Sequence, residues 1–421
     1  MKKLLFTLFL LAVAMLQAIS LDDYIGKHYR SLMNSERDAL LSDIGFENKK
    51  VIWVKTDKSV MRYAKGANLG YDLTFAGNKV VEATFSFNSS MKLKELNLSM
   101  YNRGDCGSWD AKKFKKLVGE LKDALTRYSH DKSPSTSRSS LDNAQINEWI
   151  WKANGTDATL RWSGKSDDNL EYITVVFAPH KSGGAKTLAK ELKTTTDLKD
   201  LPKRVQQEKD GTRWLDVPMV DQGGKGYCMA ATFARILKYY RSNVDQHVIA
   251  QLLDTDPTKG TNNRSGIEAM IASRNKFDVN VKEIFTDKDL DSMGGTMSYV
   301  SLYNKLAKKA KKPTISESDL NAKQEWPFKV FYEMADNKLF IEARNMKGYN
   351  TDKLMKTVKS YIDRGIPLMW FVPGHARLIN GYRGNNTIIY SDSWGAGHER
   401  KEMKAKEAVA LTYSIYSVTP K

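Results

Sequence analysis

The sequence predicts an α+β protein with two domains, in a chain of 421 residues that is long enough for two or three. Two observations lead to this prediction. Residues 45–180 alternate short β-branched and aromatic runs with glycine-containing turns and hold one long amphipathic helical pattern, as an antiparallel sheet with one main helix would. Residues 213–421 begin with an amphipathic helix and end with apolar strand patterns. Hydrophobic residues make up 41% of the chain, which is enough for both cores.

The first twenty residues have the pattern of a secretory signal peptide. Lys2 and Lys3 precede an apolar run at 4–16, and Ala18 and Ser20 are small residues at the −3 and −1 positions of a cleavage site. The run is short for a transmembrane helix, and an uncleaved anchor is the alternative. We therefore expect an exported protein, periplasmic or extracellular, with no integral membrane segment after cleavage.

The accessory domain is expected at 21–180. Its helix at Asp110–Tyr128 has an aspartate at the N-cap and an apolar stripe, and its clearest hairpin turns at Asn154-Gly155. The other predicted elements are a helical lead-in at 21–48, a strand at 51–54, a hairpin of 71–75 with 80–87 around Gly77-Asn78, strands at 93–101 and 172–177, and a serine-rich loop at 129–140. The role of this domain, as pro-segment, substrate-binding module or envelope contact, is left open.

A basic linker is expected at 181–212, with a lysine-rich helical piece at 188–193. Such a polar segment would be exposed and prone to cleavage, so it is where a zymogen would be processed. The domain at 213–421 then follows. Its predicted elements are helices at 228–240, 245–254, 266–277 and 352–364 (capped by Thr351), a strand at 279–284, an insertion or lid at 286–327 with a basic helix near 303–312, two strands within 329–342, and strands at 368–372, 375–382 and 387–391.

The stretch from Asp221 to Tyr240 contains the strongest chemical signal. A glycine-rich segment precedes Cys228, which starts the helical pattern and so belongs to its first turn. Unpaired N–H groups and the positive end of the helix dipole favour an anion there. A thiol in that place should have a lowered pKa and act as a nucleophile near neutral pH.

Three further residues complete a candidate catalytic set. His375, in G-H-A-R-L-I-N-G-Y, is the expected proton acceptor, and Asp392, in Y-S-D-S-W-G, would orient its imidazole. Gln222 lies six residues before Cys228, and its amide is expected to form an oxyanion hole with the Cys228 N–H. His398 is a weaker alternative base. Trp394 is expected to cover the His–Asp pair from water.

These motifs resemble those of papain-like cysteine peptidases over about residues 214–420. Gln222 with Cys228 resembles the nucleophile motif, the histidine strand follows at His375, and D-S-W-G at Asp392–Gly395 stands where papain has N-S-W-G. The fuller pattern is most similar to bacterial double-glycine or bacteriocin-processing peptidases, the peptidase C39-like group. The resemblance implies a papain-like fold, in which a helix carrying the cysteine packs on an antiparallel sheet carrying the histidine.

Composition bounds the remaining possibilities. The formal charge of +17 is spread along the chain, which favours a solvated basic surface with at most a weak contact to an anionic cell-envelope polymer. No nucleic-acid motif occurs, and no H-E-x-x-H or C-x-x-C indicates zinc, so we expect no nucleic acid, metal or cofactor. The glycines before Cys228 lack the phosphate-loop form. Cys106 is expected to be an incidental thiol, and a disulfide between it and Cys228 is the alternative. His28, His130 and His180 are expected to be surface histidines.

The sequence thus predicts an exported thiol peptidase that hydrolyses a peptide or protein substrate through a Cys–His–Asp triad and an acyl-enzyme. One alternative keeps the triad but changes the acceptor of the acyl group. The protein would then be a cell-wall peptide amidase or a transglutaminase- or transpeptidase-like acyl transferase. The other alternative is a non-catalytic binding protein that retains the fold.

Overall fold

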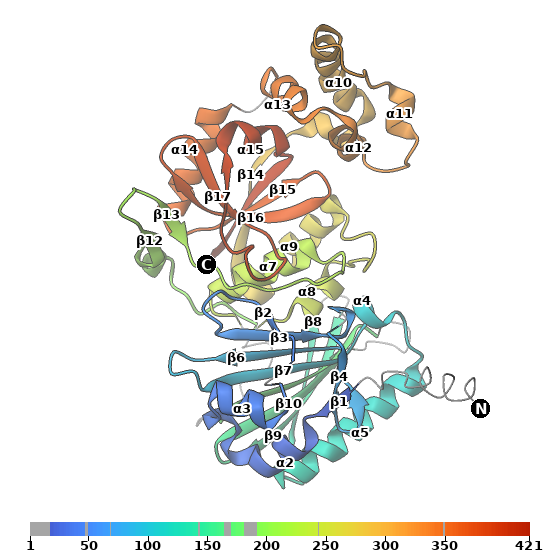
Figure 1. The fold of residues 1–421 in the computed structure, drawn as a ribbon, viewed down its shortest axis with the longest axis vertical. Helices are drawn as coiled ribbons and strands as arrows, with labels where there is room; N and C mark the ends of the chain where they lie inside the picture. Colours follow the sequence, from blue (N-terminus) through green and yellow to red (C-terminus); the bar gives the residue numbers. More distant parts are fainter. Residues whose placement is uncertain are drawn as a thin grey trace, which may run out of the picture. The chain divides into compact units, whose positions relative to one another are not determined.

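The computed structural model describes residues 17–46, 49–67, 69–141, 144–163, 170–180, 192–242, 244–347 and 350–421 (Figure 1). The chain divides into two compact units. The first contains residues up to Lys190 together with Gly223–Lys225 and Asp256–Thr258, and the second contains the remainder. Residues 1–16 of the predicted signal peptide (1–20), which include its apolar run at 4–16, lie outside the described residues.

The first unit is built on an antiparallel sheet with the strand order β2-β3-β6-β7-β11-β10-β9-β8. A small second sheet has the order β1-β4-β5. Apolar side chains of the large sheet, including Phe85 and Leu98, form one core with residues of the surrounding helices. The strands are β1 (Gln17–Ser20), β2 (Ile52–Trp53), β3 (Val60–Ala64), β4 (Tyr71–Phe75), β5 (Asn78–Lys79), β6 (Glu82–Phe87), β7 (Leu93–Asn102), β8 (Ser135–Leu141), β9 (Ala144–Ala153), β10 (Thr156–Ser163) and β11 (Tyr172–Pro179).

Helix α5 (Ala111–Ser129) contacts β9 and β10 of the large sheet. Asp110 caps it by accepting a hydrogen bond from the Lys113 N–H, as predicted, and its apolar stripe is buried. Burying one such side chain stabilises the fold by about 1.5–3 kcal/mol. The predicted hairpin at Asn154-Gly155 is confirmed as β9–β10. The other helical elements are α2 (Asp22–His28), η1 (Tyr29–Asn34), α3 (Arg37–Asp43), η2 (Lys65–Ala67) and α4 (Arg103–Cys106), of which the first three confirm the helical lead-in.

Two predictions for this unit are wrong. The serine-rich stretch predicted as a loop contains strand β8, which pairs with β9 alone. An edge strand needs one partner and keeps contact with water, so polar residues suffice there. The predicted hairpin of 71–75 with 80–87 is also wrong, because β4 turns back only onto the two-residue β5 while β6 joins the large sheet between β3 and β7. A local turn signal does not reveal that the chain changes sheets.

Lys225, which belongs to the first unit, has almost no exposed surface. Its Nζ lies 3.2 Å from Glu82 Oε2 and 2.7 Å from Asp105 Oδ2. Burial alone would lower the pKa of the ammonium, but the two carboxylates raise it. A buried ammonium is tolerated only when it is paired in this way.

The second unit contains an antiparallel sheet of order β12-β13-β16-β15-β19-β14, with β17 on β16 and β18 on β17. The three predicted strands at 368–372, 375–382 and 387–391 are confirmed as β15, β16 and β17. The strands are β12 (Val205–Gln207), β13 (Arg213–Leu215), β14 (Val279–Thr286), β15 (Leu368–Val372), β16 (His375–Arg383), β17 (Thr387–Ser391), β18 (Lys401–Lys404) and β19 (Ser414–Pro420).

Helices α7 and α14 both contact β16, the strand that begins at His375. The predicted cap of α14 is wrong by one residue, because the Asn350 side chain, not Thr351, accepts from the Lys353 N–H. Gly365 takes φ +74°, and a Cβ there would come within 2.1 Å of the Leu201 carbonyl oxygen. The helices of the sheet region are η3 (Leu198–Arg204), α7 (Cys228–Tyr239), α8 (Gln246–Leu252), α9 (Asn263–Phe277), α14 (Thr351–Ile362) and α15 (Ala405–Leu411).

The region predicted as an insertion is helical, and so is the segment at 329–342, where the prediction of two strands is wrong (Figure 1). Pro327 at the start of one helix and Asp336 at the cap of the next mark two helix starts. Phe328, Phe331 and Phe340 are buried and belong to the core of a helical cluster. Its elements are η4 (Lys288–Asp291), α10 (Met293–Lys309), α11 (Glu317–Asn321), α12 (Pro327–Met334) and α13 (Asn337–Asn345).

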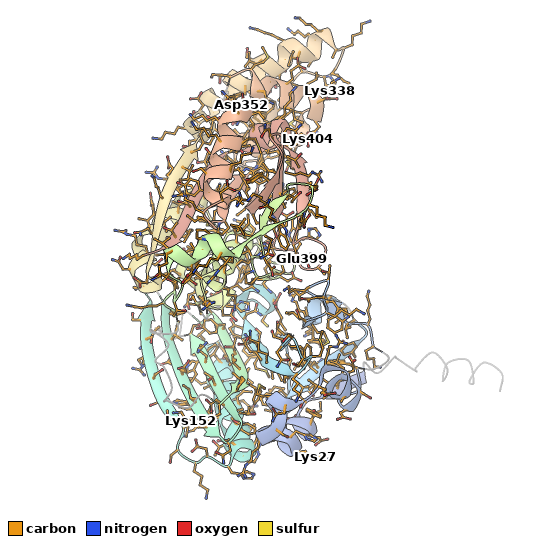
Figure 2. The ribbon with its side chains drawn as sticks, turned by 90° about the vertical axis from the view of Figure 1, so that its left-hand side faces the viewer. Lys27, Lys152, Lys338, Asp352, Glu399 and Lys404 are labelled. Atoms are coloured by element: carbon orange, nitrogen blue, oxygen red, sulfur yellow. The ribbon has the colours of Figure 1, made fainter. Side chains whose placement is uncertain are left out.

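Part of the predicted linker is regular structure. Residues 198–207 form η3 and β12, and β12 pairs with β13 in the sheet of the second unit. Most of the helical piece predicted at 188–193 lies outside the described residues. Lysines such as Lys27, Lys338 and Lys404 are exposed on separate elements, so the positive charge is distributed (Figure 2). Within the described ranges, no helix combines the length and apolar character needed to cross a membrane.

Candidate active site

Helix α7 begins at Cys228, as the sequence predicts. Tyr227 occupies the N-cap position, so Cys228 lies in the first turn of the helix, where it is partly buried. Further along the helix, the Thr232 hydroxyl donates to the Ala376 carbonyl at 3.2 Å. This bond attaches α7 to β16 directly beside His375.

His375 is the first residue of β16 and links the thiol to a carboxylate. Its Nε2 lies 2.9 Å from Asp392 Oδ1, and its imidazole hydrogen-bonds to the Cys228 thiol. Because Nε2 is taken by Asp392, Nδ1 is the ring atom left for the sulfur. The structure therefore places the predicted nucleophile, base and orienting carboxylate in one hydrogen-bonded chain.

This chain shifts the protonation of both partners. Burial alone would raise the pKa of the Cys228 thiol, but the hydrogen bond and positive charge of His375, with backbone N–H groups, lower it. Burial would likewise lower the pKa of His375, but Asp392 and Cys228 raise it to about 8. The two shifts favour a thiolate beside an imidazolium near neutral pH.

A fully buried arginine, which the sequence analysis missed, supports the loop that carries Asp392. Arg235 donates to the carbonyls of Pro218 (3.0 Å) and Asp392 (2.9 Å) and to Ser391 Oγ (2.5 Å). Burial lowers its pKa to about 10, which leaves it charged at neutral pH. Its place seven residues after Cys228, within an apolar helical stripe, is the signal that could have revealed it, because residues at that spacing share one helix face.

Gln222 is held by the residue that follows Asp392. Its backbone N–H donates to the Ser393 carbonyl at 2.8 Å, and the Ser393 hydroxyl donates to Gln222 Oε1 at 2.6 Å. Since Oε1 accepts this bond, the other end of the Gln222 amide is its NH2 group, which is left to donate. Ser393, also missed as a site residue, thus determines which end of the glutamine is the donor.

Trp394 and His398 surround the His–Asp pair. The Trp394 ring stacks on His375 with centroids 4.7 Å apart and an interplanar angle of 20°, while 47% of Trp394 stays exposed. The stack agrees with the expected covering role. His398, the weaker alternative base, has Nδ1 3.9 Å from Asp392 Oδ2 and contacts the Trp394 edge. The imidazole that hydrogen-bonds to Cys228 is that of His375.

Both cysteines are free thiols, which removes the disulfide alternative. Burial raises the pKa of Cys106, in contrast to that of Cys228. Among the residues that the structure describes, no group of three or more potential metal ligands was found. His180 lies 2.7 Å from Asp157, in an ion-pair geometry rather than a metal site.

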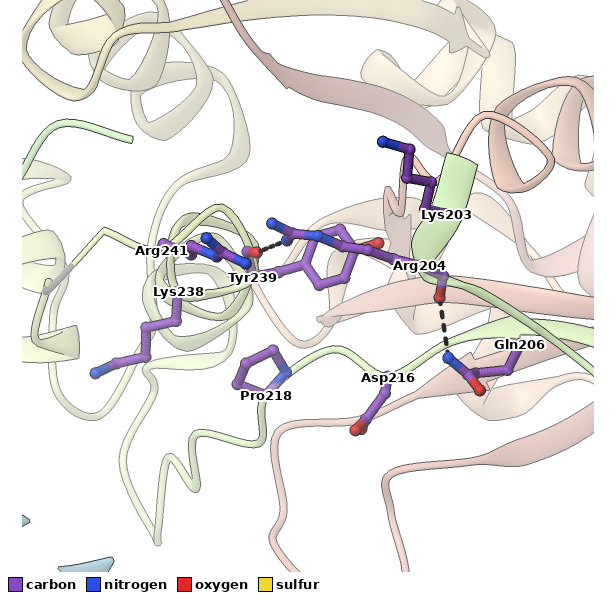
Figure 3. Close-up of a pocket in the computed structure, with 8 residues that line it drawn as sticks. All are labelled: Lys203, Arg204, Gln206, Asp216, Pro218, Lys238, Tyr239 and Arg241. Carbon is purple, nitrogen blue, oxygen red and sulfur yellow. Dashed lines mark hydrogen bonds between the residues drawn. The ribbon is translucent and has the colours of Figure 1, made fainter. Parts of the chain in front are cut away.

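A cavity of about 410 Å³ lies in the second unit, at the end of α7 (Figure 3). None of the four candidate site residues lines it. Arg204 crosses it and donates to the Tyr239 carbonyl, and Gln206 donates to the Arg204 carbonyl at 3.3 Å. Its walls are Lys203, Arg204, Gln206, Asp216, Pro218, Lys238, Tyr239 and Arg241.

A helix that begins with cysteine, packed on an antiparallel sheet whose strand begins with histidine, resembles the arrangement of papain-like thiol enzymes. The family comparison agrees: residues 214–419 match the Peptidase_C39 like family. This match supports a Peptidase_C39-like, papain-like peptidase family for residues 214–419, and it suggests a cysteine peptidase-like function. Searches of curated proteins and of solved structures found no significant match.

Proposed function

We propose that the protein is a cysteine peptidase in which Cys228 is the nucleophile, His375 the proton carrier and Asp392 the group that orients the imidazole. The observation that carries this proposal is the hydrogen-bonded chain from the thiol through His375 to Asp392, with the pKa of the thiol lowered and that of the imidazole raised. The non-catalytic alternative would require no such pairing.

The reaction follows from these positions. The Cys228 thiolate attacks a peptide carbonyl carbon, and the negative oxygen that forms accepts hydrogen bonds from the Gln222 amide and the Cys228 N–H. His375 gives its proton to the nitrogen as the C–N bond breaks, which releases the amine and leaves a thioester on sulfur. Water then adds to the thioester while His375 takes its proton, and the acid product leaves as the sulfur is regenerated.

The test compares the two thiols within one protein. Alkylation with iodoacetamide is followed over roughly pH 4–9, and Cys228 and Cys106 are read separately by peptide mass. We expect Cys228 to react well below the ordinary thiol pKa of about 8.5, and Cys106 not to. His375→Ala should abolish this difference. Equal pH profiles for the two thiols would overturn the proposal.

Activity on peptides then separates hydrolysis from acyl transfer. A quenched-fluorescent peptide library is incubated with the wild type and with Cys228→Ala, with and without an added primary amine. Hydrolysis that depends on Cys228 supports the peptidase. Products that carry the amine in preference to water would instead support the transglutaminase- or transpeptidase-like alternative.

We also propose that the protein is exported from a bacterial cell and has at most a weak affinity for anionic envelope polymers, on the basis of the N-terminal apolar run and the charge of +17. Cleavage after Ser20 would remove strand β1 from its parallel pairing with β4. N-terminal sequencing of the protein from cell fractions tests the export proposal. A cytoplasmic protein that retains Met1 would contradict it.

A further inference from the structure

Arg377 lies on the same face of β16 as His375, because alternate residues of a strand share a face. Its Nε is 2.9 Å from Asp392 Oδ1, the same oxygen that contacts His375 Nε2 at 2.9 Å. The Arg377 contact is an ion pair rather than an aligned hydrogen bond. One carboxylate oxygen is therefore shared between the imidazole and a permanent cation.

The guanidinium of Arg377 is held in place by two rings. It lies 5.7 Å from the centroid of Trp370 and 5.1 Å from that of Tyr390. Trp370 is its cross-strand neighbour on β15, and Tyr390 belongs to β17 on the other side of β16. Only 17% of the arginine side chain and 2% of the Asp392 side chain are exposed. Water thus screens this pair much less than it would a surface pair.

We propose that Arg377 is a positioning residue of the triad: it shares Asp392 with His375 and so sets the pH range in which Cys228 is a thiolate. This inference rests on the proposed function. The role of Arg377 goes beyond the proposed function, because the Cys–His–Asp set needs no second cation on the aspartate.

Arg377 has two opposed effects. It stabilises the ionised form of Asp392, which is costly to bury, and so keeps a carboxylate available to orient His375. It also repels the imidazolium, because both nitrogens contact one oxygen and therefore lie within about 6 Å of each other. Without Arg377, no second cation would oppose protonation, so the pKa of His375 and the pKa of Cys228 should both rise. Charged or titratable groups that face this site from other elements are Cys228 and Arg235 on α7, His398 and Glu399 after β17, and Tyr390 on β17.

The experiment measures the alkylation rate of Cys228 against pH in the full-length protein. The test variant is Arg377→Met, which keeps the stem and removes the charge. The control is Arg383→Met, since Arg383 lies on the same strand but is more exposed and pairs with Glu402. We expect the inflection for loss of the imidazolium proton to move to higher pH by about one unit in the test variant, as for a unit charge about 6 Å away at intermediate dielectric. The inflection for thiol ionisation should move in the same direction. Arg377→Lys, which keeps the positive charge, should bring both inflections most of the way back to their wild-type pH values.

One result would overturn the inference, namely inflections of Arg377→Met within about 0.2 pH units of those of Arg383→Met. A lower melting temperature of Arg377→Met beside such unchanged inflections would show a purely structural residue. If Arg377→Met does not fold, Arg377→Gln, which keeps a polar contact to Asp392, carries the same comparison. An unactivated Cys228 in the wild type would instead remove the proposed function itself, so the two failures are distinguishable.

Discussion

Replacing Arg235 with methionine should destabilise the second unit strongly. The guanidinium is fully buried and donates to Pro218, Asp392 and Ser391. Each buried acceptor that loses its donor costs about 1–3 kcal/mol. The variant also avoids the cost of burying a charge, which offsets part of the loss, so we expect a net loss of about 3–5 kcal/mol, the range found for broken buried ionic contacts.

Urea unfolding measures this loss. For a unit of this size, a slope of about 2–3 kcal/mol per molar urea converts the loss into a midpoint lower by about 1–2.5 M. Arg241→Met is the matched control, because Arg241 is an exposed residue just beyond the same helix and lines the open cavity. Its free energy of unfolding should stay within about 0.5 kcal/mol of that of the wild type, as for other surface substitutions.

The position of Arg235 adds a second readout. The arginine joins α7, which carries Cys228, to the loop that carries Asp392. In Arg235→Met protein that is still folded, Cys228 should therefore be alkylated more slowly at neutral pH. If the variant loses less than about 1 kcal/mol and keeps the wild-type alkylation rate, the reasoning about these three bonds is wrong.

Three shorter predictions concern the site itself. Ser393→Ala removes the donor to Gln222 Oε1, so kcat on a peptide substrate should fall about tenfold with little change in KM; an equal loss in Gln222→Ala and in the double variant would confirm one shared effect. The raised pKa of His375 contributes stability that is present below about pH 6.5 and lost as pH rises through about 8, so the urea-unfolding advantage of wild type over His375→Gln should shrink by about 2 kcal/mol between pH 6 and 9; a constant difference would contradict this. Trp394→Ala should lower kcat/KM about tenfold but stability by less than 1 kcal/mol, because the Trp394 ring stacks on His375 and is about half exposed. A loss of stability in calorimetry that accompanies the loss of kcat/KM would argue for a structural role instead.

Elements whose signals are local were predicted well. The helix at Cys228 and the strands from Leu368 to Ser391 have clear hydrophobic periods, and the structure confirms them. The α5 stripe with its aspartate cap and the Asn-Gly hairpin are of the same kind. In each, the residues that determine the conformation lie within a few positions of one another.

The errors occurred where the partner of a segment decides its conformation. The polar strand β8 exists because β9 offers it an edge, and no property of its own serines distinguishes it from a loop. The aromatic segment around Phe331 and Phe340 has strand-like composition, but those rings pack against each other within a helical cluster. Composition does not reveal which neighbours supply the buried surface.

The sequence by itself determined which residues could form the site: one cysteine at a helix start, a histidine on a later strand, an aspartate just after the next strand, and a glutamine six residues before the cysteine. Only the tertiary structure decided how their charges interact. Arg235 and Arg377 are ordinary arginines in the sequence, and they matter because folding buries one beneath Asp392 and sets the other against its carboxylate. Coulomb interactions depend on distance and on exclusion of water, and both are set by contacts between residues far apart in the chain.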